Sequence, residues 1–115
     1  MQFLLLIHAN EDRILSADEA TRAARIEAYM AFRAALEQDG AYVGSNRLQP
    51  SRTAATVRSA GGHTKIVDGP FAETKEQLGG YYLIDVADRD TALAWAARCP
   101  AATHGTVEVR PVWTM

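Results

Sequence analysis

The sequence predicts an α+β fold with an antiparallel sheet, and three observations support this. A continuous apolar run, Phe3-Leu4-Leu5-Leu6-Ile7, is typical of a strand that is buried on both faces. A long segment rich in Ala, Arg, Glu and Leu follows, and these residues favour a helix. Stretches with β-branched and aromatic residues then alternate with glycine-containing turns.

The composition is typical of one globular domain. The chain has 115 residues, of which 48% are hydrophobic and 23% charged. A formal net charge of -2, with scattered Lys and Arg, argues against general nucleic-acid binding. The single cysteine, Cys99, permits no intrachain disulfide, and we expect it to pack as a small apolar residue. The opening apolar run is too short for a signal peptide or a membrane span, so we expect a cytoplasmic protein without membrane contact.

The first half of the chain predicts one strand and one long helix. Residues 2–8 form the strand, and residues 10–12 are expected to be a loop. Ser16-Ala17-Asp18-Glu19 matches a capping box, which predicts a helix over residues 17–39. Gly40 is the expected C-terminal stop. Four apolar residues fall near one stripe of this helix and are expected to face the core: Ile26, Tyr29, Met30 and Leu36.

The second half predicts the rest of a sheet. Residues 41–48 form a second strand, and residues 53–59 and 64–67, joined through Gly61-Gly62, form an inserted β-hairpin. Residues 80–86 form the next strand. Asp88 or Asp90 caps a second helix that Pro100 ends, and residues 106–113 form the last strand. Without the hairpin the order is β-α-β-β-α-β, which is the ferredoxin-like order.

Two helices can cover only one face of such a sheet. Yet the first strand is apolar on both faces, and the strand at residues 80–86 has Tyr81 and Leu83 on one side with Tyr82, Ile84 and Val86 on the other. Exposed apolar patches of this size are rare in monomers. We therefore expect a symmetric homodimer in which a second copy covers the free face.

The segment DGPFAETKEQLGGY, residues 68–81, combines turn residues with charged groups. Asp68-Gly69-Pro70 is typical of a turn, and Phe71 is expected to anchor the loop on the core. Residues 73–77 are compatible with one helical turn, after which Gly79-Gly80 leads into the strand.

DGPFAETKEQLGGYYLID, residues 68–85, resembles the signature of the DGPF branch of the YCII-related family. The stretches MQFLLLIH, LQP, ALAWAARCPAA and VEVRPVW are similar to the family's first strand, the segment before its hairpin, its second helix and its last strand. The resemblance covers nearly the whole chain. It implies a ferredoxin-like subunit that forms a dimeric α/β barrel.

The resemblance implies two functions of different classes. Some YCII relatives are linked to lyase-type dehydrochlorination of a hydroxylated aromatic, with a His and an Asp as the acting pair. This implies a small-molecule-binding dimer, or an enzyme for cofactor-free proton transfer or elimination on a small aromatic or carboxylate metabolite. DGPF proteins also often accompany extracytoplasmic-function sigma factors, which implies a non-catalytic regulatory module. In those lyase relatives the His lies in the first helix, and residues 17–39 here contain none.

Three residues are the main candidates for proton transfer and anion binding. His8 is either a general base beside the sheet or a half-buried structural residue. Asp68 either orients His8 or bonds the backbone of its own turn. If the two are adjacent they form a His–Asp proton-transfer pair. Arg47 either clamps a substrate carboxylate or pairs with an acid at the surface.

The other candidate substrate-binding residues come from the 68–81 segment: Phe71, Glu73, Lys75 and Tyr81. The charged ones are alternatively part of a solvated loop. His63 and His104 are expected at the surface, and three scattered histidines predict no metal site. The sequence has no phosphate loop or dinucleotide fingerprint, so we expect no cofactor.

Overall fold

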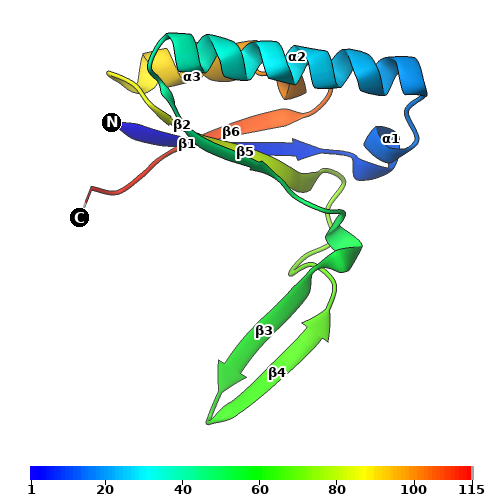
Figure 1. Cartoon of the computed structure of the whole chain (residues 1–115). Coiled ribbons are helices and arrows are strands. Elements are labelled where there is room, and N and C mark those ends of the chain that lie inside the picture. Colours follow the sequence, from blue (N-terminus) through cyan, green and yellow to red (C-terminus); the bar gives the residue numbers. More distant parts are fainter. Residues whose placement is uncertain (115) are drawn as a thin grey trace.

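The structure, a computed structural model, describes residues 1–114 and has an α+β ferredoxin-like architecture (Figure 1). Its main sheet has the strand order β2-β5-β1-β6, and all three neighbouring pairs are antiparallel. The helices lie on one face of this sheet. The strands are β1 (Gln2–Ala9), β2 (Tyr42–Arg47), β5 (Gln77–Asp85) and β6 (Thr106–Pro111), and the longer helices are α2 (Glu19–Gln38) and α3 (Arg89–Arg98).

The chain between β1 and α2 differs from the sequence prediction. Residues 10–12 are not a loop, because Asn10 caps a short helix, α1 (Glu11–Leu15), by accepting a hydrogen bond from the Arg13 N–H at 3.0 Å. The capping box at Ser16 is also wrong, since Asp18 caps α2 and accepts from the Thr21 N–H at 2.7 Å. Two strong capping residues, Asn10 and Asp18, therefore each begin a helix of their own.

The helix at Arg89–Arg98 begins as predicted. The Asp88 side chain is its N-cap and accepts hydrogen bonds from the N–H and hydroxyl of Thr91 at 2.8 and 2.7 Å. Short 3-10 turns, η1 (Ser51–Thr53) and η2 (Pro100–Thr103), complete the helical elements. Within residues 1–114, none of the helices has the length and apolar character needed to cross a bilayer.

The core lies between the sheet and the two longer helices. The Phe32 ring meets Tyr82 edge-on, with ring centroids 5.1 Å apart, and meets Trp95 in a similar geometry at 6.1 Å. Leu36 is fully buried, as predicted, but Ile26 and Met30 are 57% and 68% exposed. The predicted stripe is thus partly wrong, because α2 turns residues 25, 29, 32 and 36 towards the sheet. Cys99 packs in the core as expected, and burial raises the pKa of its thiol.

The other face of the sheet carries no helix (Figure 1). We call it the open face. Alternation along the strands places half-buried or exposed side chains on it: Leu4, Leu6, His8, Tyr81, Leu83, Asp85 and Glu108. The structure describes one chain, so the expected homodimer stays a prediction.

The inserted hairpin is confirmed, and it projects from the domain as an arm (Figure 1). It consists of β3 (Ala55–Ala60) and β4 (His63–Asp68), and Gly61 and Gly62 join them with φ of 57° and 79°. We call residues 55–68 the arm. The radius of gyration of the chain is 16.1 Å. A compact chain of this length would have ~13 Å, and the projecting arm accounts for the difference.

Two predictions for the segment after the arm are wrong. Phe71 does not anchor the loop on the core, because its side chain is 78% exposed. Its ring lies beside the arm instead, with the Arg58 guanidinium 5.8 Å from its centroid. Residues 73–76 form no helical turn, and β5 begins directly at Gln77. Gly69, with φ of 102°, makes the predicted turn.

Candidate functional site

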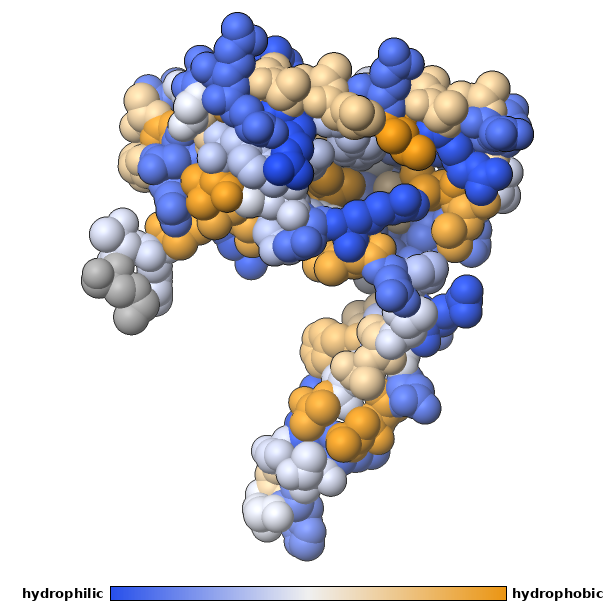
Figure 2. All heavy atoms as spheres, viewed as in Figure 1, coloured by the Kyte–Doolittle hydropathy of each residue, from blue (hydrophilic) through white to orange (hydrophobic). Residues whose placement is uncertain are grey.

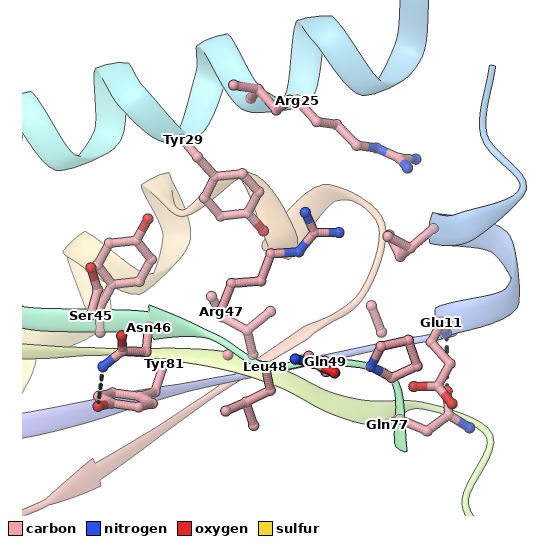
Figure 3. Close-up of a pocket in the computed structure, with 18 of the residues that line it drawn as sticks. Glu11, Arg25, Tyr29, Ser45, Asn46, Arg47, Leu48, Gln49, Gln77 and Tyr81 are labelled. Atoms are coloured by element: carbon pink, nitrogen blue, oxygen red, sulfur yellow. Dashed lines mark hydrogen bonds between the residues drawn. The ribbon is translucent and has the colours of Figure 1, made fainter. Parts of the chain in front are cut away.

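A cavity of about 660 Å³ lies between α2 and the helix-covered face of the sheet (Figure 3). We call it the α2 pocket. Figure 2 shows the molecule hollowed beneath the helical layer, with hydrophobic and hydrophilic residues around the opening. Its volume falls in the range of ~300–1,000 Å³ that is typical of small-molecule sites. The apolar part of its wall includes Ile7, Ile14, Leu15, Ile26, Met30 and Leu48.

Helix α2 supplies Arg25 and Tyr29 to the pocket. They are four residues apart and continue, towards the N-terminus, the face that buries Phe32 and Leu36. Arg25 is half-buried, and its Nη1 is buried with no hydrogen-bond partner among the described residues. An arginine on the core-facing stripe of a helix is the sequence signal that would have identified this residue.

Strand β2 supplies Arg47, which lies opposite Gly80 of β5. In Figure 3 its side chain rises from the strand towards Tyr29. Burial, with smaller contributions from Cys99 and Tyr82, raises the pKa of the Tyr29 phenol, and the positive charges of Arg25 and Arg47 partly oppose this. The phenol therefore stays protonated at neutral pH and can donate a hydrogen bond.

The acidic residue that lines the pocket, Glu11, is held by other groups. Its carboxylate accepts a hydrogen bond from the Ser51 N–H at 2.9 Å and another from the Ser51 hydroxyl. Its own N–H donates to Gln77 Oε1 at 3.0 Å. Within residues 1–114 no ion pair joins Arg25 or Arg47 to an acid. Arg22 also lines the pocket and has no ion pair among residues 1–114, so the pocket offers three arginines without an acidic partner.

His104 also lines the pocket and is half-buried, whereas the sequence had suggested the surface. It follows η2, and its Nδ1 is 3.4 Å from the Thr103 hydroxyl. Burial, assisted by the charge of Arg25, lowers the pKa of its imidazole. His104 is therefore neutral at pH 7 and can accept a proton.

Only two of the five predicted substrate-binding residues are among those that line the α2 pocket. Arg47 and Tyr81 are both among the residues that line the α2 pocket, but the Tyr81 ring lies on the open-face side of the sheet, where its hydroxyl accepts a hydrogen bond from Asn46 Nδ2 at 2.8 Å (Figure 3). Three others are exposed and do not line it: Phe71, Glu73 and Lys75.

The proposed catalytic pair, His8 and Asp68, is not in contact within one chain. His8 is on the open face, where its Nε2 is 3.6 Å from Glu108 Oε1. Asp68 ends β4 at the root of the arm, opposite Ala55, and is exposed. No hydrogen bond or ion pair among residues 1–114 joins the two side chains.

The part of the chain that the structure describes contains no cluster of side chains that could form a metal site. Residues 1–114 contain no group of three or more His, Cys, Asp or Glu side chains placed to hold a metal ion. The polar groups of the α2 pocket are mainly cationic or neutral donors, which suit an anion better than a metal.

Comparison with known proteins agrees with the architecture. A stretch of 68 residues is 53% identical to uncharacterized protein R00369 of Rhizobium meliloti (strain 1021). The match covers 57% of this chain and 55% of that protein, so the chain spans about half the length of this relative. The family model for the YCII-related domain matches residues 1–115. The chain therefore belongs to the YCII-related domain family.

Proposed function

We propose that the protein binds a small organic anion, an aromatic or other apolar body that carries a carboxylate, in the α2 pocket. The observation behind this proposal is Arg25, whose buried Nη1 has no partner among the described residues, in the same pocket as Arg47. Buried polar groups are nearly always hydrogen-bonded, so such an atom calls for an acceptor. A carboxylate matches the guanidinium fork with two parallel hydrogen bonds.

The remainder of the pocket fits the rest of such a ligand. Ile14, Leu15 and Leu48 provide an apolar wall for an aromatic ring. The protonated Tyr29 phenol supplies one more donor to the carboxylate. A free phosphate would leave the apolar wall without contact, so the wall favours a carboxylate on an apolar body.

The pocket also holds groups suited to cofactor-free proton transfer. His104 can take a proton from a carbon beside the bound carboxylate, and Tyr29 can donate one to a leaving group or enolate oxygen. These two residues line the same cavity, whereas a His8–Asp68 pair would require two chains. The proposed reaction class remains elimination or proton transfer on a small aromatic or carboxylate metabolite.

Matched pairs of ligands test the binding proposal. Benzoate and phenylacetate would be compared with benzamide and phenylacetamide by isothermal titration calorimetry and thermal shift. We expect the acids to bind, because only they carry the charge that Arg25 and Arg47 compensate. At ~100 times its dissociation constant, a ligand stabilises the fold by ~2.7 kcal/mol. Equal binding of acids and amides would refute the role of the arginines.

A regulatory module linked to an extracytoplasmic-function sigma factor is the second proposal. Its support is the exposed arm, which carries apolar side chains that suit a protein contact. This function predicts no binding of any small acid and a stable complex with the sigma factor in sedimentation. The calorimetric titrations therefore separate the two functions.

A further inference from the structure

Four large apolar side chains around the α2 pocket are exposed. They are between 41% and 68% exposed, and all of them line the cavity: Leu15, Ile26, Met30 and Leu48. Exposed apolar groups that gather at a concave surface are typical of a ligand site. Ile26 and Met30 are one helical turn apart on α2, and Arg22 precedes them by another turn, so residues 22, 26 and 30 form one row along the helix. We call it the outer row.

A second row of α2 lies deeper in the pocket. Its residues Arg25 and Tyr29 are half-buried, whereas Arg22 in the outer row is exposed. Arg47 of β2 is directed towards Tyr29 (Figure 3). Arg22 lies seven residues before Tyr29, which corresponds to ~10 Å along the helix axis. The pocket therefore has positive charge in two places, beside Tyr29 and at the start of α2.

The arginines that line the pocket exceed its acids. Arg33 is paired, because its Nε lies 2.8 Å from Glu37 Oε1. The other three form no ion pair with any residue that the structure describes: Arg22, Arg25 and Arg47. Among the described residues that line the pocket, Glu11 carries the only negative charge. Three positive charges and one negative charge leave a net charge of two, which matches a ligand with two carboxylates.

Asp18, the N-cap of α2, does not replace such a ligand. Hydrogen bonds from Thr21 and, to a smaller extent, the charges of Arg22 and Arg25 lower the pKa of its carboxyl, so both arginines lie near it. Its carboxylate accepts from the Thr21 N–H at 2.7 Å, makes no ion pair with either arginine and does not line the pocket. Both guanidinium groups can therefore bind an acid group of a ligand.

We infer that the ligand of the α2 pocket is a dicarboxylate whose two acid groups are joined by an apolar body. This inference rests on the function proposed above and narrows its ligand class. One carboxylate lies with Arg25, Arg47 and the Tyr29 hydroxyl, and the other binds Arg22 at the start of α2. The apolar body between them covers the apolar side chains of the outer row, which a small monoacid held at Arg25 would leave in water.

The size of the pocket agrees with a ligand that has two polar ends. A cavity of ~150 Å³ is enough to hold benzene. The α2 pocket has about 660 Å³, so a single ring with one carboxylate fills only part of it. A second acid group uses the remaining space and brings a negative charge to the outer row.

Phenylacetate and the ortho, meta and para isomers of phenylenediacetate test this inference. The three diacids differ in the spacing of their acid groups, and the monoamide of the tightest-binding isomer keeps its shape but lacks one charge. Isothermal titration calorimetry at low salt measures the affinities. The best diacid should bind the wild type ~10-fold more tightly than phenylacetate or the monoamide, because only the diacid presents a second charge to Arg22.

Arg22→Gln assigns this advantage to the outer row. Because Arg22 is exposed, we expect the variant to keep the fold, which thermal unfolding without ligand checks. It should bind the best diacid ~10-fold more weakly than the wild type does, and its affinity for phenylacetate should change less than about threefold. Arg13→Gln is the matched control, since Arg13 is exposed on α1 and does not line the pocket. Both affinities should stay at the wild-type level in this control.

The outcomes separate the ligand class from the binding function. If the wild type binds phenylacetate but binds the best diacid no more tightly than its monoamide, the inference is overturned and the binding function stands. Equal losses of both ligands in Arg22→Gln would mean that Arg22 and Arg25 share one carboxylate, which would also overturn the inference. If none of the acids binds, the function proposed above fails, and the inference fails with it.

Discussion

Arg47 of β2 extends across the helix-covered face of the sheet towards Tyr29 of α2 (Figure 3). The two residues lie on different layers and meet only because β2 runs beneath the first half of α2. Arg25, one helical turn before Tyr29, contributes a second guanidinium to the same pocket from α2. The anion-binding character of the pocket therefore depends on the packing of the helix on the sheet.

Arg25→Gln and Arg47→Gln should each weaken binding of the carboxylate ligand ~10–100-fold, because each removes a charge-assisted hydrogen bond. Calorimetric titration with phenylacetate measures this. Arg13→Gln is the control, since Arg13 lies on the exposed side of α1 and does not line the pocket. An unchanged affinity in both pocket variants would place the ligand elsewhere.

Tyr82 should make the fold sensitive to alkaline pH. Burial, with smaller contributions from Cys99 and Tyr42, raises the pKa of its phenol to about 12 in the folded chain, from an ordinary value of 10.0. Between these two values the unfolded chain loses the proton while the folded chain keeps it. The free energy of unfolding therefore falls as pH rises from 10.0 to about 12.

Tyr82→Phe isolates this contribution. Urea unfolding at pH 8 measures the difference in the free energy of unfolding between wild type and variant while Tyr82 is protonated in both states. The same measurement at pH 11 adds the contribution that arises from ionisation of Tyr82. We expect the variant to lose less stability than the wild type between the two pH values. Parallel losses would show that Tyr82 ionises equally in both states.

The sequence predicted the order of strands and longer helices because apolar runs and turn residues are local signals. It missed the short helix Glu11–Leu15 and chose Ser16 as the cap of the long helix, since Asn10, Ser16 and Asp18 all suit an N-cap and two of them, Asn10 and Asp18, act as one. The candidate site was predicted only at Arg47 and Tyr81. Arg25, Tyr29 and His104 come together through the crossing of α2 over the sheet, which no spacing in the sequence reports.

The rotation of α2 on the sheet gives the next prediction. Leu36 is 0% exposed and Met30 is 68% exposed, although both fall near one predicted apolar stripe. Leu36→Ala should cost ~2–5 kcal/mol in the free energy of unfolding, because it leaves a cavity in the core. Met30→Ala should change it by less than ~0.5 kcal/mol. Similar losses in urea unfolding would contradict the observed rotation of the helix.

Asp88 links the stability of α3 to acidic pH. Hydrogen bonds from the Thr91 hydroxyl and N–H hold the pKa of its carboxyl below the ordinary value of 3.8. Its stabilising contribution is present above that pH and is lost as pH falls through the folded-state pKa. Asp88→Asn keeps a capping acceptor but cannot titrate. When pH is lowered from 7 to 3, the wild type should therefore lose more free energy of unfolding than Asp88→Asn, as measured in urea. Equal losses in the two proteins would refute the linkage.

The glycine pair at the start of β5 contains one residue that packing requires and one that it does not. A Cβ on Gly80 would lie 2.8 Å from the Asn46 carbonyl oxygen, whereas a Cβ on Gly79 would meet nothing within 4 Å. Because the obstacle at Gly80 is backbone of the paired strand, Gly80→Ala must separate β2 from β5, and we expect a loss of ~1–3 kcal/mol. Gly79→Ala should stay within ~0.5 kcal/mol of the wild type. Urea unfolding of the two variants measures both free-energy losses. Because β2 carries Arg47, its separation from β5 should also weaken carboxylate binding in Gly80→Ala. Equal stability of the two variants would mean that β2 does not approach β5 as closely as the register at Gly80 indicates.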